Sequence, residues 1–463
     1  MYKYTKDNII TCGFCYLALS LFIVVSPVML IIIIILAPFF EGYQRLFNKE
    51  CESMETCTDN LRKFEQHAYD NFINQNPSIK YSIYEELVKI NYLDLQEAYI
   101  RDMHFEEDNH SEIHNINTNT NTNTNTNTNA NTRSNQPLLV IHGANSGAPV
   151  FLPIIQRLIN EGYDVHSISL PGFGLNPING NAFEDMTSTQ IVNFYVLFFG
   201  IYLDKIFPEK RPVIVGHSFG GFLSTKIAFH HPDKICGIML INPVGIFPFL
   251  GSLGTYWGII FKSGFPNRFA RKVGRLLNPL LLGCDNEENI KIAQMTCHDN
   301  CGDIIVSKFI TFDWFCSYWN IPIFFDILRI QKPLVIVVSD GDNIIPSYQS
   351  DVISMVCKHL DKPMSLFTIQ GWHYVVSDEI SVSVILEGLR YIDSSSKDPD
   401  LFKNTKEFDA SHKDSIAKLF NQYGYALYSR EESRQLIKFI VNKLFTILDM
   451  DLPEGYIDRL NIL

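Results

Sequence analysis

Between Pro137 and Ile369 short, mostly apolar runs of residues recur along the sequence. Each run ends at glycine, proline or a polar residue. Stretches of helical length and period separate most of these runs. Strands that are buried on both faces are apolar at every position, and strands that alternate with helices form a parallel sheet. We therefore predict a doubly wound, mostly parallel α/β sheet that binds ligands beyond the carboxyl ends of its strands. The runs are Leu138–Ile141, Val165–Leu170 (in which His166, Ser167 and Ser169 are polar), Val213–Val215, Ile238–Ile241, Leu334–Val338 and Met364–Ile369 (in which Ser365 and Thr368 are polar).

Composition excludes several other classes of protein. The chain has 463 residues, of which 46% are hydrophobic and 19% charged, so it is not disordered as a whole. Its net charge of −12 argues against nucleic acid as a partner, because phosphate-backbone binders are usually basic. Its 10 cysteines are too sparse for a disulfide framework and do not have the spacing of a zinc module.

The N-terminal region is apolar enough to span a membrane. Residues 8–40 contain no charged residue, and a bilayer-spanning helix needs about 20 apolar residues. The alternative is a cleaved signal peptide, but its apolar region is only about 7–15 residues long. We therefore expect a transmembrane signal anchor and a single-pass membrane protein. Its orientation stays open, because basic residues flank both ends of the segment.

The segment between this anchor and the sheet is expected to be helical. Residues 41–97 are polar with scattered apolar positions, a pattern typical of amphipathic helices. Residues 98–243 should hold the first part of the α/β core, beginning with a strand at Ala98–Phe105. Within this part, residues 115–135 contain an Asn-Thr repeat with nothing apolar to bury, and we predict a disordered loop there.

An insertion interrupts the predicted core. Residues 244–332 are too many for one connection and are rich in aromatic side chains, so we predict a helical lid over the strand ends. The core should resume at residues 333–393. Residues 394–463 are expected to form a helical C-terminal appendage, in which apolar residues from Leu436 to Leu448 recur at the spacing of one amphipathic helix.

A nucleophile motif follows the third apolar run. The sequence Gly216-His217-Ser218-Phe219-Gly220 matches G-x-S-x-G and lies between a predicted strand and a predicted helix. The turn is so tight that small residues are needed two positions before and after the serine, and it lifts the hydroxyl above the sheet. Ser218 is therefore the candidate nucleophile.

A serine hydroxyl needs a base to attack at neutral pH, and the base needs an orienting carboxylate. After this motif the expected order is serine, acid, histidine. Asp342 and His373 each follow a later strand, on the side where Ser218 emerges. Asp340 is the alternative acid. His359 is the alternative base, although it falls on a predicted helix.

The oxyanion formed by attack on a carbonyl needs two backbone donors. One is the N–H group of Phe219, directly after the nucleophile. The other is expected in the loop after His142-Gly143, most simply the N–H group of Ala144. This chemistry implies no metal and no organic cofactor.

The chain resembles the α/β-hydrolase superfamily over Pro137 to about Ile392, because these motifs occur in the same order as in that family. The stretch His373–Asp378 also looks like the H-x4-D sequence of the lysophospholipase and lysophosphatidate acyltransferase branch. Asp378 itself is better interpreted as the cap of the following helix. The motifs in family order are His142-Gly143, Pro171–Gly174, the Ser218 turn, Asp342 and His373.

The resemblance and the candidate residues together predict a membrane-anchored serine hydrolase that cleaves acyl esters, first of all lipid esters, through an acyl-enzyme. A lysophospholipid acyltransferase or an amide or peptide hydrolase on the same fold is the alternative chemistry. A non-catalytic scaffold at a membrane is the alternative of a different class. The acyl chain, the head group and the membrane stay open.

Overall fold

The computed structural model describes the greater part of the chain after residue 65. The anchor expected at 8–40, the Asn-Thr loop at 115–135 and most of the lid lie outside the described residues, so these expectations stay predictions. The described residues are 66–93, 95–107, 136–144, 146–173, 186–247, 323–342, 345–371, 379–398, 400–406, 410–423 and 430–459, with the single positions 176, 178, 183, 373 and 408.

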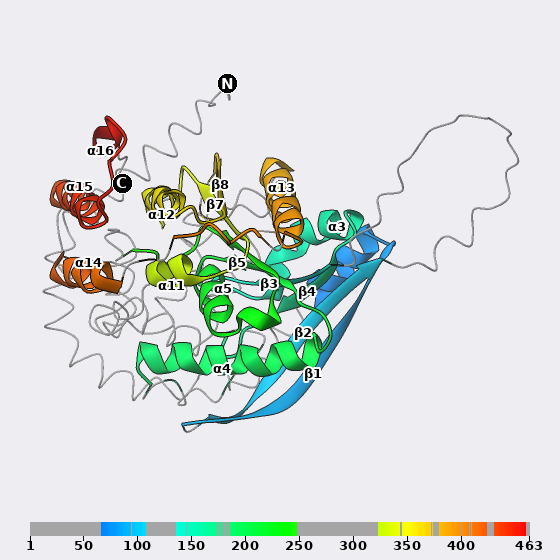
Figure 1. The fold of residues 1–463 in the computed structure, drawn as a ribbon. Helices are drawn as coiled ribbons and strands as arrows, with labels where there is room; N and C mark the ends of the chain where they lie inside the picture. Colours follow the sequence, from blue (N-terminus) through cyan, green and yellow to red (C-terminus); the bar gives the residue numbers. More distant parts are fainter. Residues whose placement is uncertain are drawn as a thin grey trace, which may run out of the picture.

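The described residues form one eight-stranded sheet in the order β1-β2-β4-β3-β5-β6-β7-β8 (Figure 1). Strand β2 is antiparallel to both of its neighbours, and the pairs from β4 to β8 are parallel. The predicted mostly parallel α/β sheet is thus confirmed. The strands are β1 Ile79–Tyr92, β2 Leu95–Glu107, β3 Pro137–Ile141, β4 Asp164–Ile168, β5 Val213–His217, β6 Gly237–Ile241, β7 Leu334–Ser339 and β8 Met364–Ile369.

Helices cover both faces of the sheet, which explains why most of its parallel strands are apolar along their length. Leu139 and Ile141 of β3 pack in one buried cluster with α4, α5, α11 and α12, whereas Leu138 and Val140 pack in the other with α3 and α13. The helices are α3 Leu152–Asn160, α4 Ser188–Ile206, α5 Phe219–His230, α11 Ile323–Arg329, α12 Tyr348–His359, α13 Glu379–Ser395, α14 Ala410–Tyr423, α15 Arg430–Ile447 and α16 Tyr456–Arg459, with 3-10 turns at Ala148–Phe151 and Pro232–Lys234.

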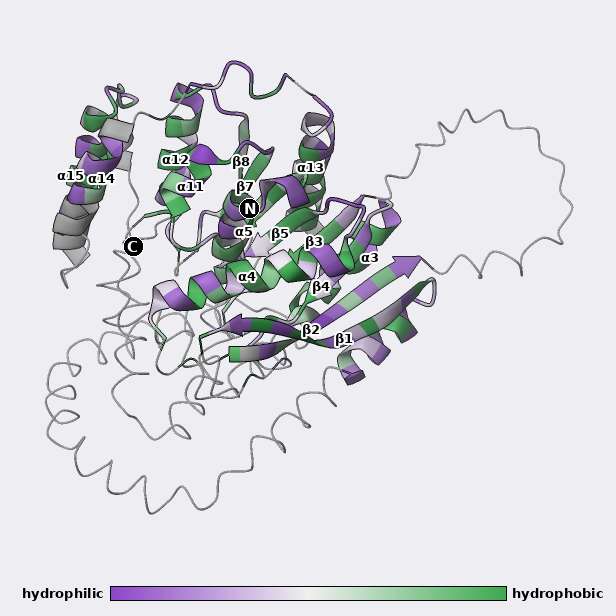
Figure 2. Cartoon of the chain, turned by 60° about the horizontal axis from the view of Figure 1, so that its bottom comes forward, coloured by the Kyte–Doolittle hydropathy of each residue, from purple (hydrophilic) through white to green (hydrophobic). Residues whose placement is uncertain are grey.

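The helical prediction for residues 41–97 is wrong at residues 79–92, which form strand β1, and at residues 95–97, where strand β2 begins. Helix is present at residues 66–75, and the strand expected at Ala98–Phe105 is β2. Strands β1 and β2 form a long antiparallel ribbon in which hydrophilic and hydrophobic segments alternate (Figure 2). Such alternation is typical of a strand with one covered face, and a β-branched and aromatic composition favours it further.

The C-terminal helices α14 and α15 pack against the core. Ile416 of α14 and Leu444 of α15 are fully buried and belong to the same apolar cluster as α11 and α12. Phe408 packs on Phe325 of α11, with 6.0 Å between the ring centroids. Among the described helices none has the length and apolarity needed to cross a bilayer.

Because α15 shares this cluster, we expect Leu444→Ala to lower the free energy of unfolding by about 2–5 kcal/mol. Asn442→Ala, at an exposed position of the same helix, should change it by no more than about 0.5 kcal/mol. Chemical unfolding of the full chain, followed by circular dichroism, measures both. Equal effects of the two substitutions would mean that α15 contributes no packing to the core.

Candidate functional site

Ser218 lies in a strained turn between β5 and α5. Its backbone has φ 54° and ψ −114°, a conformation that residues with a side chain rarely adopt. Its N–H group donates to the carbonyl of Ile241 at 2.9 Å, and its carbonyl accepts from Phe222 and Val244. The turn places Ser218 at the carboxyl end of β5, immediately before the N-terminus of α5.

Two glycines make this turn possible. A Cβ atom on Gly220 would lie 2.1 Å from the carbonyl oxygen of Ile141, and one on Gly216 would lie 2.3 Å from the carbonyl oxygen of Gly220. Backbone atoms cannot give way as a flexible side chain can, so both positions exclude larger residues. The spacing of the sequence motif thus has a direct steric cause.

His373 and Asp342 are hydrogen-bonded to each other. Nδ1 of His373 lies 2.7 Å from Oδ2 of Asp342, and the two side chains are 3% and 0% exposed. The other carboxylate oxygen, Oδ1, accepts from the N–H group of Ile345 at 2.8 Å. With both oxygens engaged, Asp342 holds the imidazole in one orientation and favours the tautomer with its proton on Nδ1.

The alternative acid, Asp340, and the alternative base, His359, do not contact Asp342 or His373 in any hydrogen bond described for them. Oδ1 of Asp340 accepts from the backbone N–H of Gly371 at 3.3 Å, so this exposed carboxylate ties the ends of β7 and β8 together. His359 is exposed at the end of α12. The structure therefore brings Asp342, and not Asp340, to His373.

Two side chains fix the backbone of His373 beside Ser218. Its carbonyl oxygen accepts from Nε2 of His217 at 2.9 Å and from Nδ2 of Asn242 at 2.8 Å. The rings of His217 and His373 have centroids 4.9 Å apart. Since His217 directly precedes Ser218, these contacts bring His373 to the same edge of the sheet as the serine. Asn242 is not among the predicted site residues, because its only signal in the sequence is its place at the end of a predicted strand.

His142 and His217 are buried neutral imidazoles. Nε2 of His142 accepts from the N–H group of Leu170 at 3.0 Å, so its proton is on Nδ1, which donates to the carbonyl of Gly143 at 2.7 Å. Burial lowers the pKa of His142 to about 4 and, with the nearby His373, lowers the pKa of His217 to about 3. Neither can exchange protons near neutral pH, so both support the loops around Ser218.

The loop after β3 approaches the serine closely. A Cβ atom on Gly143 would lie 3.1 Å from the Cβ atom of Ser218. Ala144 is the next residue of this loop, and Phe219 is the first residue of α5. A helix N-terminus carries partial positive charge and favours a developing anion. The edge around Ser218 thus has a hydroxyl, an oriented imidazole and the N-terminus of a helix.

Comparison with known proteins agrees with this architecture. Residues 136–365 match the alpha/beta hydrolase fold family. The chain belongs to the α/β-hydrolase superfamily.

Similarity to individual proteins is confined to part of the chain. An abhydrolase domain-containing protein, abhd-5.2 of Caenorhabditis elegans, is 31% identical over 24% of this chain and 24% of its own length. A pimeloyl-[acyl-carrier protein] methyl ester esterase of Shewanella woodyi is 29% identical over 23% of this chain and 35% of its own. A bovine (lyso)-N-acylphosphatidylethanolamine lipase is 27% identical over 24% and 32%. The chain therefore matches less than half the length of these curated relatives.

The two buried imidazoles predict a pH-dependent stability. In the unfolded chain both have a pKa near 6.5, above the folded values of about 4 and 3. The unfolded state therefore binds more protons as the pH falls, and the free energy of unfolding should decrease from about pH 6.5 towards pH 4. The stability that the neutral rings contribute is fully present only above about pH 6.5.

His217→Gln should reduce this pH dependence by up to about 1.4 kcal/mol per pH unit, because one titrating group is removed. Glutamine can still donate to the carbonyl of His373. His359→Gln, at an exposed position, is the control and should leave the dependence unchanged. Urea unfolding across this pH range measures both, and equal slopes in wild type and His217→Gln would contradict the neutral assignment.

Proposed function

We propose that the chain is a serine hydrolase that cleaves acyl esters through an acyl-enzyme. The observation that carries this proposal is the buried hydrogen bond of 2.7 Å between Asp342 and His373, next to the strained turn of Ser218. A non-catalytic scaffold has no physical need for a buried, carboxylate-oriented imidazole beside a serine at a helix N-terminus. Esterase and lipase activities among the relatives agree with this choice.

In the proposed mechanism Oγ of Ser218 attacks the ester carbonyl while Nε2 of His373 accepts its proton. Asp342 stabilises the imidazolium that forms and keeps the ring in position. The N–H groups of Phe219 and Ala144 are the proposed donors to the oxyanion. His373 then protonates the leaving alcohol, and a water molecule, activated by the same imidazole, hydrolyses the acyl-enzyme. Transfer of the acyl group to another alcohol in place of water would give the acyltransferase alternative.

A lipid-like acyl group is the proposed substrate class. The insertion leaves the core after β6, and its described ends are held together by aromatic packing: Phe247 stacks on Phe324 with 5.4 Å between centroids, and on Tyr348 with 6.3 Å. All three rings are buried in the apolar cluster of the core, so the described ends of the insertion begin and end in apolar packing. The bovine relative is a lipase named for a lysophospholipid-type substrate, which favours acyl chains over short polar esters.

The assignment of the acid and base is tested by substitution. Ser218→Ala and His373→Ala should each lower turnover of a p-nitrophenyl ester by about 10⁴-fold or more, and the double variant should lose little further, because the residues act as a unit. Asp342→Asn should lower it by about 10⁴-fold, because the carboxylate orients the imidazole. Asp340→Asn is the matched control and should cost less than about tenfold.

Labelling by a fluorophosphonate probe gives an independent readout, since it needs only the activated serine. Wild type should be labelled and Ser218→Ala should not. Absence of labelling in folded wild type would favour the scaffold. A crippling effect of Asp340→Asn with a mild effect of Asp342→Asn would refute the acid assignment.

The acyl-chain proposal predicts a rising series of p-nitrophenyl esters. Burial of one methylene contributes about 0.8 kcal/mol, and 1.36 kcal/mol is tenfold in rate. Each added methylene should therefore raise kcat/KM by up to about fourfold, until the binding site is full. A flat or falling series from acetate to octanoate, measured on an enzyme that the probe does label, would move the substrate towards short esters or amides.

A further inference from the structure

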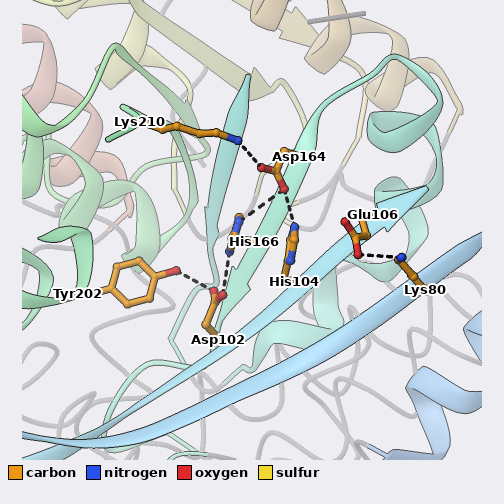
Figure 3. Close-up of polar contacts among 8 residues, drawn as sticks. All are labelled: Lys80, Asp102, His104, Glu106, Asp164, His166, Tyr202 and Lys210. Carbon is orange, nitrogen blue, oxygen red and sulfur yellow. Dashed lines mark hydrogen bonds and ion pairs between the residues drawn. The ribbon is translucent and has the colours of Figure 1, made fainter. Parts of the chain in front are cut away.

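A second group of polar side chains lies at the opposite end of the sheet from Ser218. Asp164 is the first residue of β4 and is in register with Pro137, the first residue of β3. His166 follows two residues later on the same face of β4, and His104 of β2 is its cross-strand partner. In Figure 3 the three side chains point toward one another from the two strands. The proposed hydrolase mechanism uses none of them.

These three side chains direct donor atoms to one point. Oδ1 of Asp164 accepts a hydrogen bond from Nε2 of His104 at 2.6 Å and lies 3.6 Å from Nε2 of His166, and the three donor atoms all lie within 4.8 Å of one another. In a tetrahedral zinc site with bonds of about 2.0–2.1 Å, neighbouring ligand atoms lie roughly 3.3 Å apart. The two observed distances bracket this value. Within the described part of the chain, no other group of three His, Cys, Asp or Glu has donor atoms this close together.

Buried hydrogen-bond partners on the side away from Asp164 orient the ring of His166. Nδ1 of His166 lies 2.8 Å from Oδ2 of Asp102, which is almost fully buried, and the hydroxyl of Tyr202 donates to Oδ1 of the same carboxylate at 2.7 Å (Figure 3). These two hydrogen bonds fix the orientation of the His166 ring, so that Nε2 faces Asp164. A carboxylate behind a histidine is the usual arrangement around a metal ligand.

Lys210 contacts Asp164 at the carboxylate oxygen that the histidines do not use. Its Nζ atom lies 3.3 Å from Oδ2 of Asp164, whereas both histidines face Oδ1. His104 and Asp164 are 29% and 23% exposed at their side chains, which leaves access for a water molecule as a fourth ligand.

The two histidine rings are packed parallel to each other. The imidazoles of His104 and His166 are stacked with 4.3 Å between centroids and 8° between planes. In this arrangement both rings present their Nε2 atoms to the same oxygen of Asp164.

We propose that His104, Asp164 and His166 bind a divalent cation of the zinc type, in a site that ties β2 to β4. Two imidazoles, one carboxylate and one water are a ligand set that zinc accepts. Strand β2 of the β1–β2 ribbon pairs with β4 at four positions, and one further backbone hydrogen bond joins Ser169 to Arg101. A cation across His104 and His166 adds a strong link at one of these pairs, so its role is structural.

Metal binding to the purified full chain tests the proposal. Wild type should take up one more equivalent of Zn²⁺ than Asp164→Asn or His104→Gln, measured by equilibrium dialysis with metal analysis. Co²⁺ in place of Zn²⁺ should give the absorption of a tetrahedral site in wild type alone. Each substitution should weaken the site by at least about 100-fold, and Asp102→Asn by about 10–100-fold through the orientation of His166. His359→Gln, an exposed histidine of α12, is the matched control and should bind as wild type.

Thermal unfolding supplies the second measurement. Zn²⁺ at about 100 times its Kd should raise the Tm of wild type by a few degrees, and EDTA should reverse the shift. Circular dichroism checks that each variant is folded, and His104→Gln, at the most exposed of the three positions, keeps the test possible if Asp164→Asn does not fold. Equal metal uptake by wild type and both variants, or no uptake by folded wild type, would overturn the proposal.

Discussion

The close approach of Gly220 to the backbone of β3 determines the rest of the carboxyl edge. Because α5 begins directly after Ser218, its first turn must lie against Ile141 and His142, where even a Cβ atom has no room. The chain reaches this position only by holding Ser218 at positive φ, at a cost of about 1–3 kcal/mol. Hydrogen bonds from Ser218 to Ile241 and from Phe222 and Val244 to Ser218 offset that strain.

The same contacts couple the serine to the histidine. His217 belongs to the strained turn and donates to the carbonyl of His373, while Asn242, itself at φ 43°, donates to the same oxygen from the end of β6. Asn242 also exchanges hydrogen bonds with Ser339 at the end of β7. Four strand ends are thereby joined, so the relative position of Ser218 and His373 follows from the sheet and not from a free loop.

Most of the central sheet could be predicted because burial on both faces leaves a local signal. Strand β6, predicted at Ile238–Ile241, spans Gly237–Ile241 and is buried at every position. Strand β1 could not be predicted because its buried face changes along the ribbon: Ile79 packs in one apolar cluster, whereas Val88 and Ile90 pack in the other. That change interrupts the period of two near Tyr84 and gives apolar spacings that also suit a helix. At the site, the motif order predicts Ser218, Asp342 and His373, and the structure pairs Asp342 with His373, whereas Asn242 depends on tertiary contacts that no local pattern records.

The cluster of His104, Asp164 and His166, at the amino ends of the parallel strands, also could not be predicted from local sequence. Asp164 and His166, two residues apart, would share one face of a strand, but nothing near them in the sequence indicates His104, whose contact with Asp164 spans 60 positions. Only the pairing of β2 with β4 brings them together. The two edges also differ in their physical requirements. The proposed attack on a carbonyl needs a preorganised serine, and hydrogen bonds of Ser218, His217 and Asn242 hold the carboxyl edge in place. The proposed cation site at the amino edge has only to hold an antiparallel ribbon on a parallel sheet. Donor atoms on adjacent strands, oriented by the buried Asp102, are sufficient for this role.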